Sequence, residues 1–202
     1  MLPDEDCGIV LRFQESGERF LSLAFFSETQ GLYHPLLRPS KKDTRPDLFD
    51  TARIKLSKAK QGSLVFASEY SPIRRRSGLS RSYANLTLAA RFAEIVRINI
   101  QHLPDHQIIF ELSSRLFDSL ESAPAPKAAY LKTLYLFAKT EGFAVREDWV
   151  AGLDRVSRES LAQILRRSLA EQTDDPHLFD SLTLSLENWL SGNADFIIPR
   201  NL

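Results

Sequence analysis

The sequence contains a single cysteine, Cys7. One cysteine excludes an internal disulfide and any zinc site built from several cysteines. No apolar run approaches the roughly 18 residues that a membrane-spanning helix needs. The first residues, MLPDEDCG, are acidic and no signal-type apolar segment follows them, so we expect a cytoplasmic protein.

Patterns typical of catalysis are also missing. The eight glycines form neither a phosphate-binding loop nor a dinucleotide fingerprint, and no serine stands in a nucleophile-elbow pattern. His102 and His106 are four residues apart, but Pro104 lies between them and argues against a shared helical face that holds a metal. We therefore expect a protein that is not an enzyme and that uses no cofactor and no metal.

The net charge is zero, with 26 basic and 26 acidic residues, which argues against a wholly cationic nucleic-acid binder. The distribution is uneven, because twelve Lys and Arg residues but only four Asp and Glu residues lie between Arg38 and Arg81, a net charge of +8. Such an excess creates a positive patch even on a neutral protein. It indicates either a site for an anionic ligand or a sheet edge protected by solvated charges.

The first third of the chain contains short segments typical of β-strands. In one of them, Leu21, Leu23 and Phe25 recur at every second position, which is the pattern of a half-buried strand. Another places Arg53 and Lys55 on the face opposite its apolar residues. Five such strands in succession favour a small barrel of the OB-fold type, and a proline at position 72 is expected to end the β region. The predicted strands are 8–14, 18–26, 32–38, 49–58 and 63–70.

From Ser80 onward the hydrophobic period changes from 2 to 3.6 residues, which indicates helices. Ser80 or Ser82 can cap a long first helix that runs to about His102, and Ser157 can cap a later one. Residues 143–156 form the least regular part of this half. The predicted fold class is α+β, with an N-terminal five-stranded OB-fold-like β-barrel in residues 1–79 followed by an all-α helical bundle domain in residues 80–202.

Several segments match the pattern of a known family. The opening GIVLRFQESGE, the strand LSLAFFS and the turn SETQG resemble the start of the bacterial recombination mediator RecO, and a basic loop, RPSKKDTR, follows the third strand. Further on, ARFAEIVRINIQHLPDHQIIFELSSRLFDSLE and YLKTLYLFAKTEGF are similar to the first three helices of the RecO helical domain. The positions that match at the start are Leu11, Arg12, Gly17, Glu18, Phe26, Glu28 and Gly31.

The resemblance implies a protein that binds single- and double-stranded DNA, anneals complementary strands and helps to load the RecA recombinase during recombinational repair of damaged DNA. It implies RecR and the C-terminal tail of the single-stranded-DNA-binding protein SSB as partners, and a nucleoid-associated location in the cytoplasm. Many members carry a four-cysteine zinc site in the C-terminal domain. This chain has no cysteine after Cys7 and so lacks that site.

Binding of a single strand needs cations that follow the backbone and flat side chains on which bases stack. Tyr33, His34 and Tyr70 are candidates for stacking, although each can equally fill the barrel core or rim. Because phosphate contacts carry little sequence information, we expect binding without sequence preference that weakens with salt. The predicted DNA-binding residues are Arg38, Lys41, Lys42, Arg45, Arg53, Lys55, Arg74, Arg75, Arg76 and Arg81.

Two questions stay open at the level of sequence. Asp43 and Asp47 dilute the basic loop, so a protein-interaction adaptor with a RecO-like fold and little DNA affinity is the alternative. An acidic tail with an apolar end, such as that of SSB, would need an apolar pocket with a basic rim. The basic residues of the helical region either form such a rim or lie on solvated helix faces. Candidates for that rim are Arg91, Arg97, Lys132, Lys139 and Arg146.

Overall fold

The computed structural model describes residues 3–39, 44–58, 64–102, 106–172, 175–192 and 196–199. The chain divides by packing into two compact units, one of residues 1–77 with 100–114 and one of residues 78–99 with 115–202. The first unit therefore contains the strands together with a segment from the helical half. The predicted boundary between residues 79 and 80 follows the change of hydrophobic period, and it stays a prediction.

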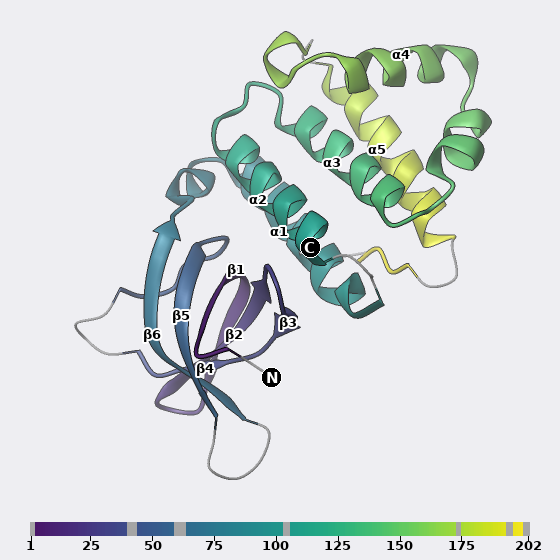
Figure 1. Cartoon of the computed structure of the whole chain (residues 1–202). Helices are drawn as coiled ribbons and strands as arrows, with labels where there is room; N and C mark the ends of the chain where they lie inside the picture. The colour runs from purple at the N-terminus through teal and green to yellow at the C-terminus, as the bar shows by residue number, and fades with distance from the viewer. Residues whose placement is uncertain are drawn as a thin grey trace. The chain divides into compact units, whose positions relative to one another are not determined.

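Five strands of the first unit form a closed barrel, as predicted (Figure 1). The sheet order is β1-β5-β6-β4-β2-β3, and an additional β1–β2 pairing closes the ring, so β3 pairs only at the edge of β2. All neighbours are antiparallel except β4 and β6, which are parallel. The strands are β1 (Glu5–Ser16), β2 (Phe20–Ser27), β3 (Gly31–Tyr33), β4 (Leu36–Leu37), β5 (Thr51–Lys58) and β6 (Val65–Arg74).

The core of the barrel follows the period-2 pattern of the sequence. Leu23 and Phe25 are fully buried, and Leu21 packs against the same cluster, so the predicted inward face of β2 is confirmed. Ile54 and Ala67 contribute to the cluster from β5 and β6. The alternate residues of these strands consequently face outward.

The predicted strand 32–38 is wrong as a single strand, because it is divided into β3 and β4. The break falls at His34 and Pro35. A proline has no backbone N–H to donate to a sheet, yet the carbonyl oxygen of Pro35 still accepts a hydrogen bond from the backbone N–H of Leu23 at 3.0 Å. The break leaves β4 only two residues long.

Pro72 does not end the β region, contrary to the prediction. Strand β6 continues to Arg74, and Pro72 lies opposite Ala52 of β5, next to a register shift between Thr51 and Ala52. The other neighbour of β6 pairs only at Phe66 and Ala67. Pro72 therefore occupies an edge that no second strand of the described part of the chain bonds, which is where a sheet tolerates proline.

The first part of helix α2 (His106–Ser122) packs against the barrel at β2 and at the β2–β3 turn. The ring of Phe110 meets that of Phe26 edge-on, with centroids 5.9 Å apart. His106 lies against the β2–β3 turn at Gly31, where an added Cβ would come within 2.8 Å of the imidazole. Gly31 also has a φ of +71°, a conformation that side chains rarely adopt. The turn thus needs glycine for two reasons.

The second unit is helical, and aromatic residues form its centre. Phe92 is fully buried, and its ring lies within 6.4 Å of the rings of Phe117, Tyr130 and Phe137. Helix α3 (Pro126–Thr140) and helix α5 (Pro176–Ser191) lie side by side (Figure 1). The helices besides α2 are α1 (Tyr83–Asn99), α3 (Pro126–Thr140), α4 (Arg155–Arg166) and α5 (Pro176–Ser191), with short helical turns at Ser77–Arg81, Ile100–His102, Val145–Val150 and Leu169–Glu171.

The ends of the helices follow capping chemistry. The hydroxyl of Ser82 accepts a hydrogen bond from the backbone N–H of Asn85 and caps α1, one of the two serines predicted for that role. Asp154 caps α4 by accepting from the N–H of Ser157 at 3.0 Å. Ser157 is therefore inside the first turn of α4 and is not its cap, which corrects the prediction.

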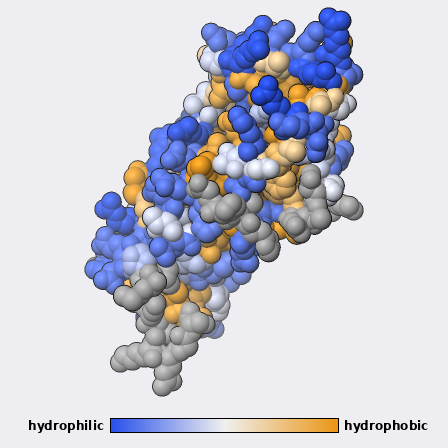
Figure 2. Space-filling view, turned by 45° about the vertical axis from the view of Figure 1, so that its right-hand side comes forward, coloured by the Kyte–Doolittle hydropathy of each residue, from blue (hydrophilic) through white to orange (hydrophobic). Residues whose placement is uncertain are grey.

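Among the described residues, no helix combines the length and the apolarity that a membrane crossing requires. On the face seen in Figure 2, hydrophilic residues predominate, and hydrophobic residues appear in small groups between them. Across the same described residues, no group of three or more His, Cys, Asp and Glu side chains is arranged to hold a metal ion.

Candidate nucleic-acid interface

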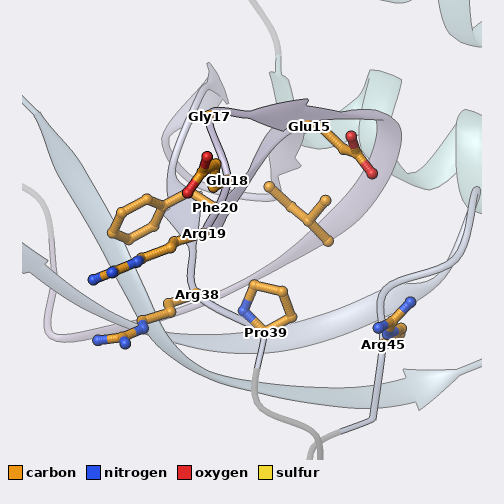
Figure 3. Close-up of a pocket in the computed structure, with 9 residues that line it drawn as sticks. Glu15, Gly17, Glu18, Arg19, Phe20, Arg38, Pro39 and Arg45 are labelled. Carbon is orange, nitrogen blue, oxygen red and sulfur yellow. The ribbon is translucent and has the colours of Figure 1, made fainter.

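A hollow of about 460 Å³ on the barrel collects three arginines, Arg19, Arg38 and Arg45. Figure 3 shows Arg19 and Arg38 reaching in the same direction on one side of the hollow, with Arg45 on the other side. Within the described part of the chain, none of the three forms an ion pair with a carboxylate. Glu15 and Glu18 also line the hollow, so it has a mixed rim with an excess of one positive charge.

Each arginine is placed by a different connection between strands. Arg19 lies in the β1–β2 turn, which Gly17 allows through its φ of +65°. Arg38 directly follows the short strand β4, and Arg45 lies in the connection from β4 to β5. All three side chains are exposed. Lys41 and Lys42, which the sequence also predicted for this loop, lie outside the described residues.

The two predicted residues of β5 lie away from the hollow and among carboxylates. Lys55 is opposite Glu5 on one neighbouring strand and Glu69 on the other, and its Nζ is 3.4 Å from the Glu69 carboxylate. Arg53 lines a separate shallow hollow with Glu5 and Asp6. The acidic neighbours offset much of the positive charge that the sequence places on this strand.

Arg76 is interior, which removes it from the predicted DNA-binding set. The residue is only 3% exposed. Its guanidinium donates hydrogen bonds to the carbonyl oxygen of Phe49, to the Thr51 hydroxyl at 2.9 Å and to the Ser114 hydroxyl at 2.9 Å. A buried cation whose donors are taken up by acceptors of the fold serves the fold and does not meet a ligand.

The remaining predicted arginines are exposed. Arg74 ends β6, and Arg81 ends the helical turn Ser77–Arg81 in the other compact unit. Arg75 donates to the carbonyl oxygen of Arg45 at 2.9 Å and lies 3.9 Å from the carboxylate of Asp50. Arg75 therefore helps to hold the segment that carries Arg45 into the hollow.

Asp50 anchors the same segment from the interior. Its Oδ2 accepts hydrogen bonds from the Tyr70 hydroxyl at 2.7 Å and from the backbone N–H of Asp47 at 3.1 Å, while its Oδ1 is buried and has no hydrogen-bond partner among the described residues. Burial raises the pKa of the Asp50 carboxyl, although these two hydrogen bonds and the charge of Arg75 oppose the shift.

The predicted stacking residues are mostly structural. The Tyr70 hydroxyl donates to Asp50, and the Tyr33 hydroxyl donates to Asp6 at 2.7 Å. Burial, together with these bonds to carboxylates, raises the pKa of both phenols. His34 is exposed and lies in the break between β3 and β4. The two tyrosines therefore belong to the core and rim of the barrel, which is the alternative that the sequence left open.

Sequence reasoning missed three residues at this site: Arg19, Phe20 and Phe66. Phe20 lines the hollow, and its ring centroid is 5.8 Å from that of Phe66. A signal was present, because Phe20 is out of phase with the inward-facing Leu21 and Leu23 and so had to face outward. The register that brings Phe66 beside it was not readable from the chain.

The helical unit has a hollow of about 370 Å³ lined by Arg91 and Leu184. Arg91 is not a free cation, because Glu187 accepts bonds from its Nε at 2.7 Å and its Nη2 at 2.6 Å. Among the other candidates for a basic rim, Arg97 pairs with Glu94 and Lys132 donates to a backbone carbonyl. Lys139 and Arg146 are exposed.

Comparison with known proteins adds no name to this geometry. No protein-family model matches the chain, and no curated protein matches it. Any functional assignment therefore has to rest on the fold and on the hollows described above.

Proposed function

We propose that the protein is a RecO-like recombination mediator, one that binds single- and double-stranded DNA without sequence preference and anneals complementary strands. In this role it assists RecA loading in recombinational repair, together with RecR and the SSB tail, and it carries out no covalent chemistry. The observation that supports the proposal is the hollow lined by Arg19, Arg38 and Arg45 on an OB-fold-like barrel. Barrels of this type bind nucleic acids with positively charged grooves.

The hollow suits phosphate groups better than a specific base sequence. Arginine presents several N–H donors in a planar fork that matches phosphate oxygens. Contacts of this kind fix the position of a strand but do not read its sequence. Glu15 and Glu18 on the same rim limit the number of phosphates that can approach, so the expected affinity is moderate.

The test compares the wild type with the triple variant Arg19→Ala/Arg38→Ala/Arg45→Ala in fluorescence anisotropy with a labelled oligonucleotide. Each phosphate contact contributes a slope of about −0.7 to log K against log salt on single strands. The triple variant should therefore bind more weakly, with a slope flatter by about 2. Lys55→Ala is the matched control, because it removes a barrel cation that already has a carboxylate partner.

The alternative function is a protein-interaction adaptor with the same fold and little DNA affinity. The pairing of Lys55 with Glu69 and the burial of Arg76 favour the adaptor, because both reduce the cationic surface that the sequence predicts. If the wild type shows no salt-sensitive binding at micromolar concentration, the mediator proposal is wrong and the adaptor is favoured. If the triple variant binds as the wild type does, the hollow is not the DNA site.

A further inference from the structure

Aromatic residues occupy outward positions on the barrel, where polar residues are the rule. Strand alternation directs Leu21 inward and Phe20 outward on β2, and it directs Ala67 inward and Phe66 outward on β6. Both phenylalanines are only partly buried. An outward strand position on a solvent-facing barrel usually carries a polar side chain.

The two rings come together across β4. Register places Leu36 of β4 opposite Ser22 of β2 and Phe66 of β6, so Leu36 lies on the same outward face. Because β4 is only two residues long, the rings of Phe20 and Phe66 approach to 5.8 Å at an angle of 52°. The result is a partly exposed aromatic pair that joins two strands which do not pair with each other.

Cations stand next to this aromatic pair. Arg19 precedes Phe20 in the chain, Arg38 follows β4, and Phe20 lines the hollow with both of them. In the close-up view, the Phe20 ring lies beside Arg19, and the Arg38 guanidinium extends the same way (Figure 3). Flat apolar faces bordered by phosphate-binding cations are the two components from which proteins build sites for unpaired strands.

We propose that Phe20 and Phe66 form a base-stacking platform that makes the barrel select unpaired DNA over duplex. Bases of a single strand stack on the two rings while Arg19, Arg38 and Arg45 contact the adjoining phosphates. Bases inside a duplex are covered on both faces by their neighbours, so a duplex meets the arginines but not the rings. The inference rests on the proposed DNA-binding function and adds to it a preference between the two strand states.

The experiment measures the affinities of the full-length protein for a single-stranded oligonucleotide and for a duplex of the same length. The variant Phe20→Leu/Phe66→Leu keeps apolar side chains but removes the aromatic faces. Its affinity for the single strand should fall by about fivefold to a hundredfold, given the known cost of losing a base–aromatic contact, while its duplex affinity stays within about twofold, since phosphate contacts set that term. Tyr83→Leu, which removes an aromatic side chain that is 84% exposed in the other compact unit, is the control and should change neither affinity.

A second readout reports stacking directly. A single strand that contains 2-aminopurine should change its fluorescence on binding to the wild type, and this change should be lost in the double leucine variant. Equal loss of both affinities, or no loss of either, overturns the platform while leaving the mediator proposal in place, provided that the wild type binds DNA. Absence of any binding by the wild type overturns both.

Discussion

Among single residues, Arg76 shows how far a charged side chain can depart from its expected role. Its guanidinium joins the carbonyl oxygen of Phe49, the hydroxyl of Thr51 and the hydroxyl of Ser114. Phe49 has a φ of +65°, which is uncommon for a residue other than glycine. The arginine thus satisfies the polar groups of a strained turn and connects that turn to α2.

We expect Arg76→Ala to lower the free energy of unfolding by about 2–4 kcal/mol, because it leaves a buried carbonyl oxygen and two partly buried hydroxyls without this donor. Urea denaturation followed by circular dichroism measures this change. The control is Arg53→Ala, which removes an exposed arginine from β5 and should alter stability by less than about 0.5 kcal/mol. Similar effects of the two substitutions would contradict a structural role for Arg76.

Asp50 couples the stability of the barrel to pH. Because burial raises the pKa of its carboxyl above the usual value, folding favours the protonated form. This group contributes stability that is fully present below its pKa in the unfolded chain, and the contribution is lost as pH rises through the higher pKa of the folded state. At neutral pH the ionised carboxylate is therefore a cost to the fold, which Tyr70, the N–H of Asp47 and Arg75 partly offset.

Asp50→Asn removes this titration while keeping an oxygen for Tyr70. The melting temperature of the variant, relative to that of the wild type, should rise as the pH is raised from about 4 to about 7. Thermal denaturation at several pH values measures the difference between the two melting temperatures. The contributions of the other titrating groups are common to both proteins and cancel in this difference. A constant difference between Asp50→Asn and the wild type would show that Asp50 does not titrate in this range.

At the level of secondary-structure elements, the first part of α2 completes the barrel. Phe110 is 8% exposed and contacts Phe26, while His106 lies against the turn at Gly31. Phe26 follows the inward-facing Phe25 on β2, so its side chain points out of the barrel and would meet water if no other element covered it. A helix that is distant in the sequence therefore supplies apolar surface that the strands themselves lack.

Phe110→Ala should destabilise the protein by about 3 kcal/mol, the cost of removing a large side chain from a well-packed site. Chemical denaturation monitored by circular dichroism is the measurement. Gln107→Ala, on an exposed face of the same helix, serves as the control and should have little effect. Equal stability of Phe110→Ala and the wild type would mean that α2 merely touches the barrel and does not stabilise it.

The elements themselves were predictable wherever one physical signal dominated. Leu21, Leu23 and Phe25 alternate so regularly that the face of β2 could be assigned from the chain. Pro35 interrupts a strand that was predicted to be continuous, whereas Pro72 lies inside a strand that was predicted to end there. The effect of a proline depends on whether the N–H at its position would face a partner strand. That depends on the neighbours of the strand, and sequence alone does not reveal them.

For the whole molecule, the fold class followed from a change of hydrophobic period, while the candidate site did not follow from charge. The excess of basic residues between Arg38 and Arg81 is real, yet it divides among an exposed hollow, a carboxylate-paired strand and a buried arginine. Lys55 and Glu69 are fourteen positions apart and meet only through strand register. Charge counts along a chain cannot show such pairing.

The two-residue length of β4 has a consequence for the barrel as a closed object. Among the described residues, two residue pairs join β4 to β2 and two join it to β6, so the barrel can open at β4 with the loss of fewer hydrogen bonds than at a longer strand pairing. A molecule that stacks on both Phe20 and Phe66 connects β2 to β6 directly, without relying on the hydrogen bonds of β4. Binding of such a molecule would then stabilise the closed form of the barrel, and the closed form would in turn favour binding. The pairings of β4, which are the shortest in the barrel, would be the ones that the bound molecule stabilises.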